Sequence, residues 1–280
     1  GIGADVTGFR AYAEGAGLDF NADFQHSAFE AGVYGVPTYV LQDATGATTQ
    51  RYFGREHLPR IAWHLTGEQG PAPDIAYESG LDAGRTPPAT KSLTVCVDFK
   101  SAGAYLAVQP TIAMARDAGI DLQWRIIHTP ALREPIDPGA KPDRGALHKY
   151  TRGRYVVDDL RRYAAHELYD LHDAERSDFA AAGLLWVINN QGDVRAYVTA
   201  VFARFWLQRA NIDSVADIAE VLVGLGIEVS GFAGFVETSG VAQAQSQRDG
   251  YAHQGLHEDL HDAAEVQHQV EGGLPLNGIV

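Results

Sequence analysis

The amino-acid sequence predicts an α/β protein, and three patterns along the chain predict it. Residues 35–63 follow a strand–turn–strand–helix pattern, residues 93–127 follow a strand–helix–strand pattern, and residues 155–236 have almost entirely helical periodicity. The length of 280 residues has room for one large domain or two small ones. The strands therefore come in two short groups, and most of the helices follow the second.

The first group of strands is defined by an apolar run and a turn. Residues 38–41 (Thr-Tyr-Val-Leu) are apolar and β-prone, residues 44–46 (Ala-Thr-Gly) form a turn, and residues 48–53 form a second strand. Apolar residues then recur at helical spacing from Leu58 to Leu65. We expect a hairpin followed by one short helix.

The second group follows a stretch rich in proline, glycine and polar residues. Residues 66–91, which contain Gly-Pro-Ala-Pro and Thr-Pro-Pro, are typical of a linker or a long crossing loop. Leu93–Val97 is an apolar strand of the buried type, Ala104–Ala118 a helix and Leu122–Ile127 a second strand, which makes a β-α-β unit. The predicted parts of the chain are residues 1–67, a linker 68–91, residues 92–245, and a His- and acid-rich tail 246–280 that is irregular or a frayed helix.

Composition and charge exclude several classes of protein. Lys and Arg number 22 against 36 Asp and Glu, and the net charge of −14 disfavours general affinity for nucleic acid or anionic lipid. No apolar run approaches the roughly 18 residues needed to cross a bilayer. The single cysteine, Cys96, excludes an internal disulfide and a Cys-x-x-Cys redox pair, and its apolar strand predicts a buried, inert thiol. A start at Gly1 without a signal peptide suggests a processed or fragmentary chain.

A short internal repeat links the start of the chain to its C-terminal third. Residues 1–9 (Gly-Ile-Gly-Ala-Asp-Val-Thr-Gly-Phe) match residues 224–232 (Gly-Leu-Gly-Ile-Glu-Val-Ser-Gly-Phe) at a constant offset of 223 residues. Both copies are typical of the end of one helix, a capping Thr or Ser, and the start of the next. The same offset relates three further pairs: Tyr12 and Phe235, Glu14 and Glu237, Gly17 and Gly240.

A duplicated domain explains this shared register. The chain would then begin late in one copy and run through most of the next. At the same offset the segment Gly35–Thr38 falls on Glu258–His261, which lacks a proline. The second copy is therefore either truncated before that point or diverged beyond recognition.

Several strings resemble one known family. Residues 97–101 (Val-Asp-Phe-Lys-Ser), followed by Ala-Tyr-Leu-Ala at 104–107, resemble the first strand and helix start of DsbA-like thioredoxin-fold proteins, and Trp124-Arg125 fits their second strand. Residues 32–38 (Gly-Val-Tyr-Gly-Val-Pro-Thr) resemble the cis-proline segment, and residues 52–58 (Tyr-Phe-Gly-Arg-Glu-His-Leu) a later Phe-Gly element. The branch that they resemble most contains 2-hydroxychromene-2-carboxylate isomerases and kappa-class glutathione transferases. The resemblance covers nearly all of residues 1–245 and implies a thioredoxin-like fold with a large all-helical insertion.

The chain departs from the family in two ways. Ser101-Ala102-Gly103 stands where the family has Ser-Pro-Tyr, while Glu56 and His57 replace an Asp and an Arg. The halves also come in rotated order, because the cis-proline half precedes the serine half. They either belong to different copies of a tandem pair or form one circularly permuted domain.

The resemblance implies a glutathione site, and each residue of that site also has a plainer interpretation. Ser101 follows a strand and opens a helix, where its hydroxyl could position a glutathione thiolate or could simply cap the helix. Pro37, if its peptide bond is cis, would expose the backbone of Val36 to the cysteinyl part of glutathione; otherwise it is an ordinary proline before an edge strand. Arg55 and Glu56 would hold the γ-glutamyl end, or would form an exposed ion pair.

Other candidate residues favour structural roles. His128, after the second strand of the β-α-β unit, could line a pocket, although a lone histidine is more often structural or exposed. The aromatic stripe of Tyr197, Phe202, Phe205 and Trp206 is more typical of helical core than of a ligand platform. The string His257-Glu258-Asp259-Leu260-His261 satisfies a zinc-binding pattern, but in a His- and Glu-rich tail it arises easily, and we expect no metal.

The sequence thus predicts a glutathione-dependent isomerase or transferase acting on a small electrophilic, aromatic substrate, with glutathione as co-substrate. The alternative is a DsbA-like domain without catalysis, with a binding or scaffold role; thiol-disulfide oxidoreductase activity is less consistent with one cysteine. We expect a cytoplasmic protein with a small-molecule substrate, no nucleic-acid or membrane partner, and helices that could form a homodimer contact.

Overall fold

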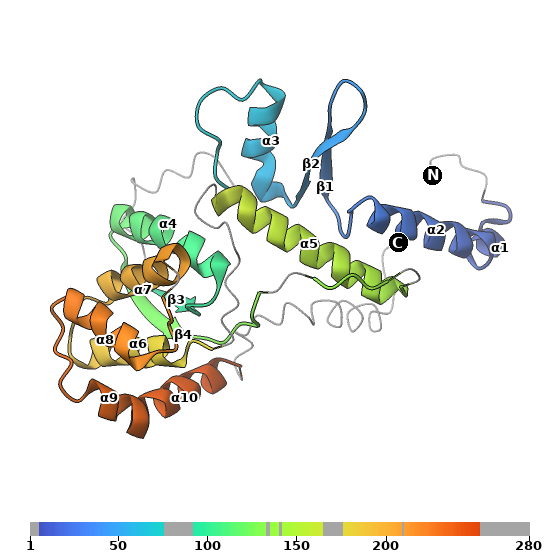
Figure 1. The fold of residues 1–280 in the computed structure, drawn as a ribbon. Coiled ribbons are helices and arrows are strands. Elements are labelled where there is room, and N and C mark those ends of the chain that lie inside the picture. The colour runs from blue at the N-terminus through green and yellow to red at the C-terminus, as the bar shows by residue number, and fades with distance from the viewer. Residues whose placement is uncertain are drawn as a thin grey trace, which may run out of the picture. The chain divides into compact units, whose positions relative to one another are not determined.

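The computed structural model describes residues 6–75, 92–132, 135–139, 142–164, 176–208 and 210–252. The chain forms two compact units, one of residues 1–81 with 134–163 and the other of residues 82–133 with 164–280 (Figure 1). Within the described residues, each unit has its own two-stranded sheet. Residues 134–163, from the middle of the predicted part 92–245, thus belong with the N-terminal unit.

The first unit contains the predicted hairpin and the predicted short helix, and both are confirmed. Strands β1 and β2 pair antiparallel, with Thr38 opposite Phe53. Their turn is fixed by Asp43, whose carboxylate accepts hydrogen bonds from the backbone N–H groups of Thr45 (2.8 Å) and Ala47 (3.0 Å). The elements of this unit are α1 (Phe9–Ala13), α2 (Ala16–Glu30), β1 (Thr38–Gln42), β2 (Thr48–Phe53), the 3₁₀ turn η1 (Arg55–His57), α3 (Leu58–Leu65) and most of α5 (Arg144–Ala164).

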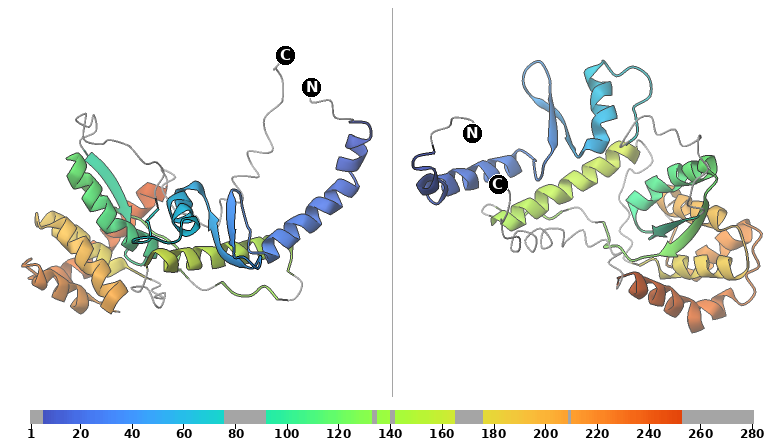
Figure 2. Two further views of the ribbon diagram at one scale, coloured as in Figure 1. Left: turned by 90° about the horizontal axis from the view of Figure 1, so that it is seen from above. Right: turned by 180° about the vertical axis from the view of Figure 1, so that it is seen from behind.

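Helix α5 holds the hairpin and α3 together around Tyr52. The Tyr52 side chain is fully buried, and its hydroxyl is 2.8 Å from Nε2 of His64 on α3, which lies beside the hairpin (Figures 1 and 2). The guanidinium of Arg162 lies 4.2 Å from the Tyr52 ring centroid and donates a 2.9 Å hydrogen bond to the carbonyl of Arg51. Arg162 on α5 therefore packs inward against the hairpin.

The second unit begins with the predicted β-α-β unit, which is confirmed. Strands β3 and β4 are parallel, from Ser92 opposite Asp121 to Val97 opposite Ile126. Ser92–Thr94 is exposed, so the prediction of a buried strand is wrong for its first half. The elements are β3 (Ser92–Val97), α4 (Ala102–Ala118), β4 (Asp121–Ile126), α6 (Asp178–Asn189), α7 (Val194–Gln208), α8 (Val215–Gly224), α9 (Phe232–Phe235), the π-helical turn η2 (Val236–Gly240) and α10 (Val241–Ala252).

The core of the second unit is built on α6 and α7. The aromatic stripe on α7 is confirmed as core, since none of its four side chains is more than 5% exposed. Tyr197 donates a 2.8 Å hydrogen bond from its hydroxyl to the carbonyl of Ala180 on α6. Gly183 makes room for this ring, because a Cβ at Gly183 would lie 2.9 Å from Cζ of Tyr197.

Parts of the sequence predictions lie outside the described residues. They include most of the linker (76–91) and most of the tail (253–280) with its His257–His261 string. Residues 246–252 of the predicted tail are helical, as the end of α10. Among the described residues, no helix combines the length and the apolar character that crossing a membrane requires.

Candidate functional site

Ser101 connects β3 to α4 and caps that helix. Its backbone is extended (φ −84°, ψ 116°), and its Oγ accepts a hydrogen bond from the backbone N–H of Ala104 at 3.2 Å. The first N–H groups of a helix have no partners within the helix, and the aligned peptide dipoles make this end positive. The half-buried hydroxyl of Ser101 therefore lies where an anionic ligand atom would be stabilised.

A buried ion pair, Asp98 with Lys100, precedes Ser101. Their side chains are 0% and 1% exposed, and they contact each other directly. The Asp98 carboxylate also accepts hydrogen bonds from Ser177 Oγ (2.6 Å), Thr129 N (2.8 Å) and Thr129 Oγ1 (3.1 Å). Burial raises the pKa of Asp98, but Lys100 and these donors outweigh it and hold that pKa below its ordinary value. The ionised carboxylate thereby ties the loop before Ser101 to two other segments of the unit.

His128 lies at the edge of this network. Its Nδ1 is 3.5 Å from Nζ of Lys100, and its ring is exposed. Partial desolvation and the charge of Lys100 lower the pKa of His128, so the imidazole is neutral at pH 7. The structure thus places His128 next to the ion pair.

Cys96, on β3, is half-buried and not fully buried as the sequence predicts. Desolvation raises the pKa of its thiol, against a smaller opposing effect of Arg125. A raised pKa keeps the thiol protonated at neutral pH and weakens it as a nucleophile.

In the first unit, Val36 and Pro37 lie just before β1. The Val36–Pro37 peptide bond is cis, and the Val36 side chain is 87% exposed. Gly54 donates a backbone hydrogen bond to the carbonyl of Pro37 at 3.1 Å, and Thr38 Oγ1 donates to the carbonyl of Gly35 at 2.7 Å. The start of η1 is therefore tied to the proline segment.

Arg55 and Glu56 form η1 together with His57. Arg55 is exposed, while the Glu56 side chain is 26% exposed and folds back over Gly54, where a Cβ would lie 2.6 Å from the carboxylate carbon. Gly54 has a φ of 102°, a conformation that favours glycine. The turn thus brings the Glu56 carboxylate close to Gly54, whose backbone N–H is hydrogen-bonded to the Pro37 carbonyl.

The predicted site residues fall into two half-sites. Val36, Pro37, Arg55 and Glu56 belong to the first unit, where the Gly54–Pro37 hydrogen bond joins their two segments, whereas Ser101 belongs to the second unit. Each half-site is defined within its own unit.

Sequence reasoning missed the polar cluster around His57. The buried His57 ring is hydrogen-bonded through Nδ1 to the Tyr163 hydroxyl (2.7 Å) and lies 3.3 Å from the Tyr155 hydroxyl and 4.0 Å from an Asp159 oxygen. Burial raises the pKa of Tyr163 to about 12 and also raises the pKa of Asp159 above its ordinary value. These partners on α5 are about a hundred positions away along the chain, so no local pattern could reveal them.

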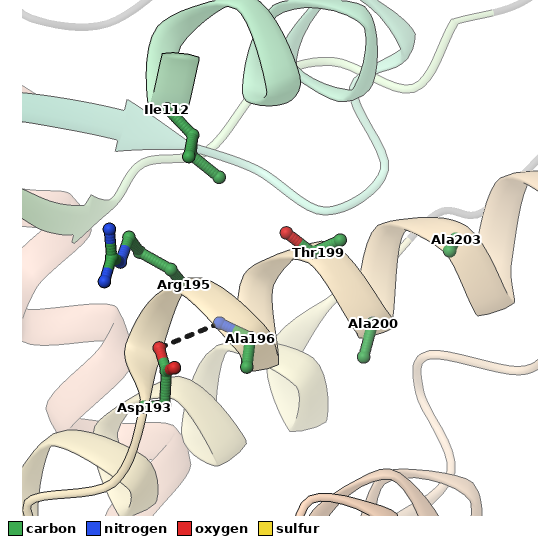
Figure 3. Close-up of a pocket in the computed structure, with 7 residues that line it drawn as sticks. All are labelled: Ile112, Asp193, Arg195, Ala196, Thr199, Ala200 and Ala203. Atoms are coloured by element: carbon green, nitrogen blue, oxygen red, sulfur yellow. Dashed lines mark hydrogen bonds between the residues drawn. The ribbon is translucent and has the colours of Figure 1, made fainter. Parts of the chain in front are cut away.

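An open pocket lies between α4 and α7, and none of the predicted site residues lines it (Figure 3). Asp193 on its rim accepts a 3.0 Å hydrogen bond from the backbone N–H of Ala196 and so caps α7. The residues that line the pocket are Ile112, Asp193, Arg195, Ala196, Thr199, Ala200 and Ala203. Among the described residues, no group of three or more His, Cys, Asp or Glu side chains could hold a metal ion.

Comparison with known proteins identifies one family. The family model described as the DSBA-like thioredoxin domain matches residues 95–255, which is more than half of the chain. The chain is similar to the solved structure of 2-hydroxychromene-2-carboxylate isomerase (22% identity, TM-score 0.44, covering 59% of this chain and 81% of that one). It is also similar to the cytosolic disulfide reductase DsbM from Pseudomonas aeruginosa with GSH (17% identity, TM-score 0.40, the same coverage). No curated protein sequence matches the chain. The family match includes Asp98, Lys100 and Ser101.

Proposed function

The chain belongs to the DSBA-like thioredoxin domain family, and from this premise we propose that it is a glutathione-dependent isomerase or transferase acting on a small electrophilic, aromatic substrate. The glutathione thiolate would add to an electrophilic carbon of the substrate. In the isomerase case it would leave again after rotation about the bond that the addition had made single. The observation that carries the proposal is the position of Ser101 at the N-terminus of α4.

The chemistry of Ser101 suits a thiolate. Its Oγ accepts from the Ala104 N–H, so the hydroxyl keeps its own proton to donate to a ligand. A hydrogen bond to an anion is about twice as strong as one between neutral groups, and the positive helix end adds to it. Both effects lower the pKa of a thiol bound there and raise its thiolate fraction at neutral pH.

The buried pair Asp98–Lys100 supports Ser101 without competing with it. Because the two opposite charges lie in contact, their fields largely cancel outside the pair. The N-terminus of α4 then still contributes positive potential at the hydroxyl. We assign the pair the role of fixing the loop that sets the Ser101 backbone.

The half-site of the first unit, taken by itself, would recognise the peptide backbone and the γ-glutamyl end of a glutathione molecule. The exposed backbone at Val36 would pair with the cysteinyl residue, held by the Pro37 segment. Arg55 and Glu56 would hold the carboxylate and the ammonium of the γ-glutamyl end. A cytoplasmic setting, in which glutathione is kept reduced, agrees with this use of it.

Calorimetric titration of the full chain with reduced glutathione tests the proposal. The wild type is expected to bind, and Ser101→Ala to bind at least about tenfold more weakly, because a charge-assisted hydrogen bond is lost. Ser214→Ala is the matched control: Ser214 also caps a helix of this unit, accepting from Asp217 N at 3.3 Å, so both variants lose a cap. Equal affinities for both variants, or no wild-type binding at millimolar glutathione, would refute the proposal.

The alternative is a family member with a binding or scaffold role and no catalysis. Ala102-Gly103 after Ser101, in place of the family's proline and aromatic residue, favours it. The same titration separates the two, since a scaffold domain would leave glutathione unbound. Thiol-disulfide exchange is not proposed, because one cysteine with a raised pKa offers neither a partner nor a thiolate.

A further inference from the structure

Two loops are joined at the carboxyl end of the sheet in the second unit. Strands β3 and β4 are parallel neighbours, so the loops that follow them lie at the same edge (Figure 1). Ile127 donates its N–H to the carbonyl of Val97 at 3.0 Å, and Thr129 donates its N–H to the Asp98 carboxylate at 2.8 Å. His128 lies between these two anchored residues, so its backbone is held beside the loop that follows β3.

The same aspartate also holds Ser101. The Ser101 N–H donates a 2.9 Å hydrogen bond to the Asp98 carbonyl, while the Ser101 Oγ caps α4. His128 and Ser101 therefore follow neighbouring parallel strands, on loops that Asp98 ties together. Ligands of open α/β sheets bind outside the carboxyl ends of the strands. Both side chains are thus at the end of this unit where a ligand is expected.

Lys100 determines which ring nitrogen of His128 carries the proton. The Lys100 ammonium pairs with the ionised carboxylate of Asp98, and its Nζ is 3.5 Å from Nδ1 of the imidazole. A lysine ammonium can only donate hydrogen bonds. Nδ1 is therefore the acceptor, and the proton of the neutral ring lies on Nε2.

The Nε2–H group of His128 is available to a ligand. Nε2 has no hydrogen-bond partner in the part of the chain that the structure describes, and the ring is exposed. Desolvation and the charge of Lys100 lower the pKa of His128, which keeps the imidazole neutral at pH 7. A neutral imidazole can donate a hydrogen bond to a carbonyl oxygen on which negative charge develops. The nitrogen that faces away from Lys100 is therefore a donor and not a base.

We propose that His128 is a catalytic hydrogen-bond donor, which stabilises the oxyanion formed when a glutathione thiolate adds to an aryl enone. This inference rests on the proposed function and adds a requirement for the substrate, a carbonyl group conjugated with the electrophilic carbon. The sulfur bonds to that carbon, the electrons of the C=C bond shift toward the carbonyl, and Nε2–H donates to the oxygen that becomes negative.

The oxyanion then has two fates. In the isomerase case the electrons return after bond rotation and the S–C bond breaks, which releases the thiolate. In the transferase case the enolate carbon takes from solvent the proton that glutathione lost when it became a thiolate. His128 keeps its own proton in both cases, so its role is electrostatic.

Heteronuclear NMR of the full chain with isotopically labelled histidine tests the tautomer. The His128 signals are identified by their absence from His128→Gln. At about pH 7 they should show a protonated Nε2 and an unprotonated Nδ1. A proton on Nδ1 would overturn the proposal, because Nε2 would then have nothing to donate.

Kinetics with glutathione and benzylideneacetone, an aryl enone, test the donor. His128→Ala should lower kcat about 100-fold, the usual effect of removing one oxyanion donor, and leave the glutathione Kd within about twofold. His128→Gln should recover at least about tenfold of that loss, because an amide N–H can donate although an amide cannot act as a base. Gln123→Ala is the matched control: it removes another exposed polar side chain, on β4, and should keep the wild-type kcat.

The outcomes separate this proposal from the proposed function. No turnover by the wild type would overturn both. Turnover that His128→Ala leaves within about threefold of the wild type would overturn the donor role alone. A loss that His128→Gln does not recover would indicate a base or a structural role, and a glutathione Kd that rises as much as kcat falls would place His128 at glutathione; either result contradicts the proposal.

Discussion

Replacing Lys100 by methionine tests the account of the buried pair most directly. Methionine keeps most of the aliphatic stem and removes the charge, which leaves Asp98 buried without its counter-ion. Removing one partner of a buried pair costs about 3–5 kcal/mol. Asp98 keeps its hydrogen bonds from Ser177 and Thr129, so we expect a loss at the lower end, about 3 kcal/mol at pH 7.

The loss should depend on pH in a defined direction. In the folded wild type the pKa of Asp98 is depressed, so its ionised form adds stability above the unfolded pKa of about 3.9. That contribution disappears as the pH falls through the lower, folded pKa. In Lys100→Met the lysine charge no longer offsets the burial of Asp98, so the pKa of Asp98 rises. As the pH falls, Asp98 is therefore protonated earlier in the variant than in the wild type, and protonation removes the unpaired buried charge. The difference in unfolding free energy should therefore shrink below about pH 4.

Urea denaturation followed by circular dichroism, at pH 7 and at about pH 3, measures this difference. The double variant Asp98→Asn/Lys100→Met removes both charges and should recover part of the loss, because no unpaired charge remains. An equal loss at both pH values, with no recovery in the double variant, would show that packing of the lysine stem accounts for the stability instead.

Two further substitutions test packing in the second unit, each beside a matched control. Phe232→Ala should lower the free energy of unfolding, measured by urea denaturation, by about 3–5 kcal/mol, because the Phe232 ring is buried. Phe9→Ala should change it by less than about 0.5 kcal/mol, because the Phe9 ring is exposed. Similar losses for the two variants would contradict this difference in burial. Gly183→Ala should cost about 1–3 kcal/mol because its Cβ would press on the Tyr197 ring. Gly224→Ala, where a Cβ meets nothing within 4 Å, should be neutral or stabilising.

The elements with strong local signals were predictable from the sequence. The Ala-Thr-Gly turn at residues 44–46, between the β-prone run 38–41 and the strand 48–53, predicts the hairpin within a residue of its observed ends. Ser101 and Gly119 likewise delimit α4, as a capping serine and a left-handed closing glycine. Such signals involve only residues that are neighbours in the sequence, so they can be recognised without knowledge of the fold.

What could not be predicted depends on distant partners. The string Asp98-Phe99-Lys100 gave no sign that its two charges are buried, because their partner Ser177 comes 79 positions later. Leu93–Val97 was predicted as buried because its residues are apolar, yet Leu93 is 36% exposed. Burial of a strand is decided by what packs on it, which composition alone does not fix.

The internal repeat, residues 1–9 and 224–232, allows the effect of tertiary packing to be measured within one molecule. Two segments of nearly equal sequence and equal backbone geometry occur in one molecule, one covered by a helix and one open. Because both segments belong to the same molecule, they are always measured in the same buffer and at the same temperature. Any difference in local opening free energy between residues 9–17 and 232–240 therefore reports what the covering helix contributes beyond local propensity.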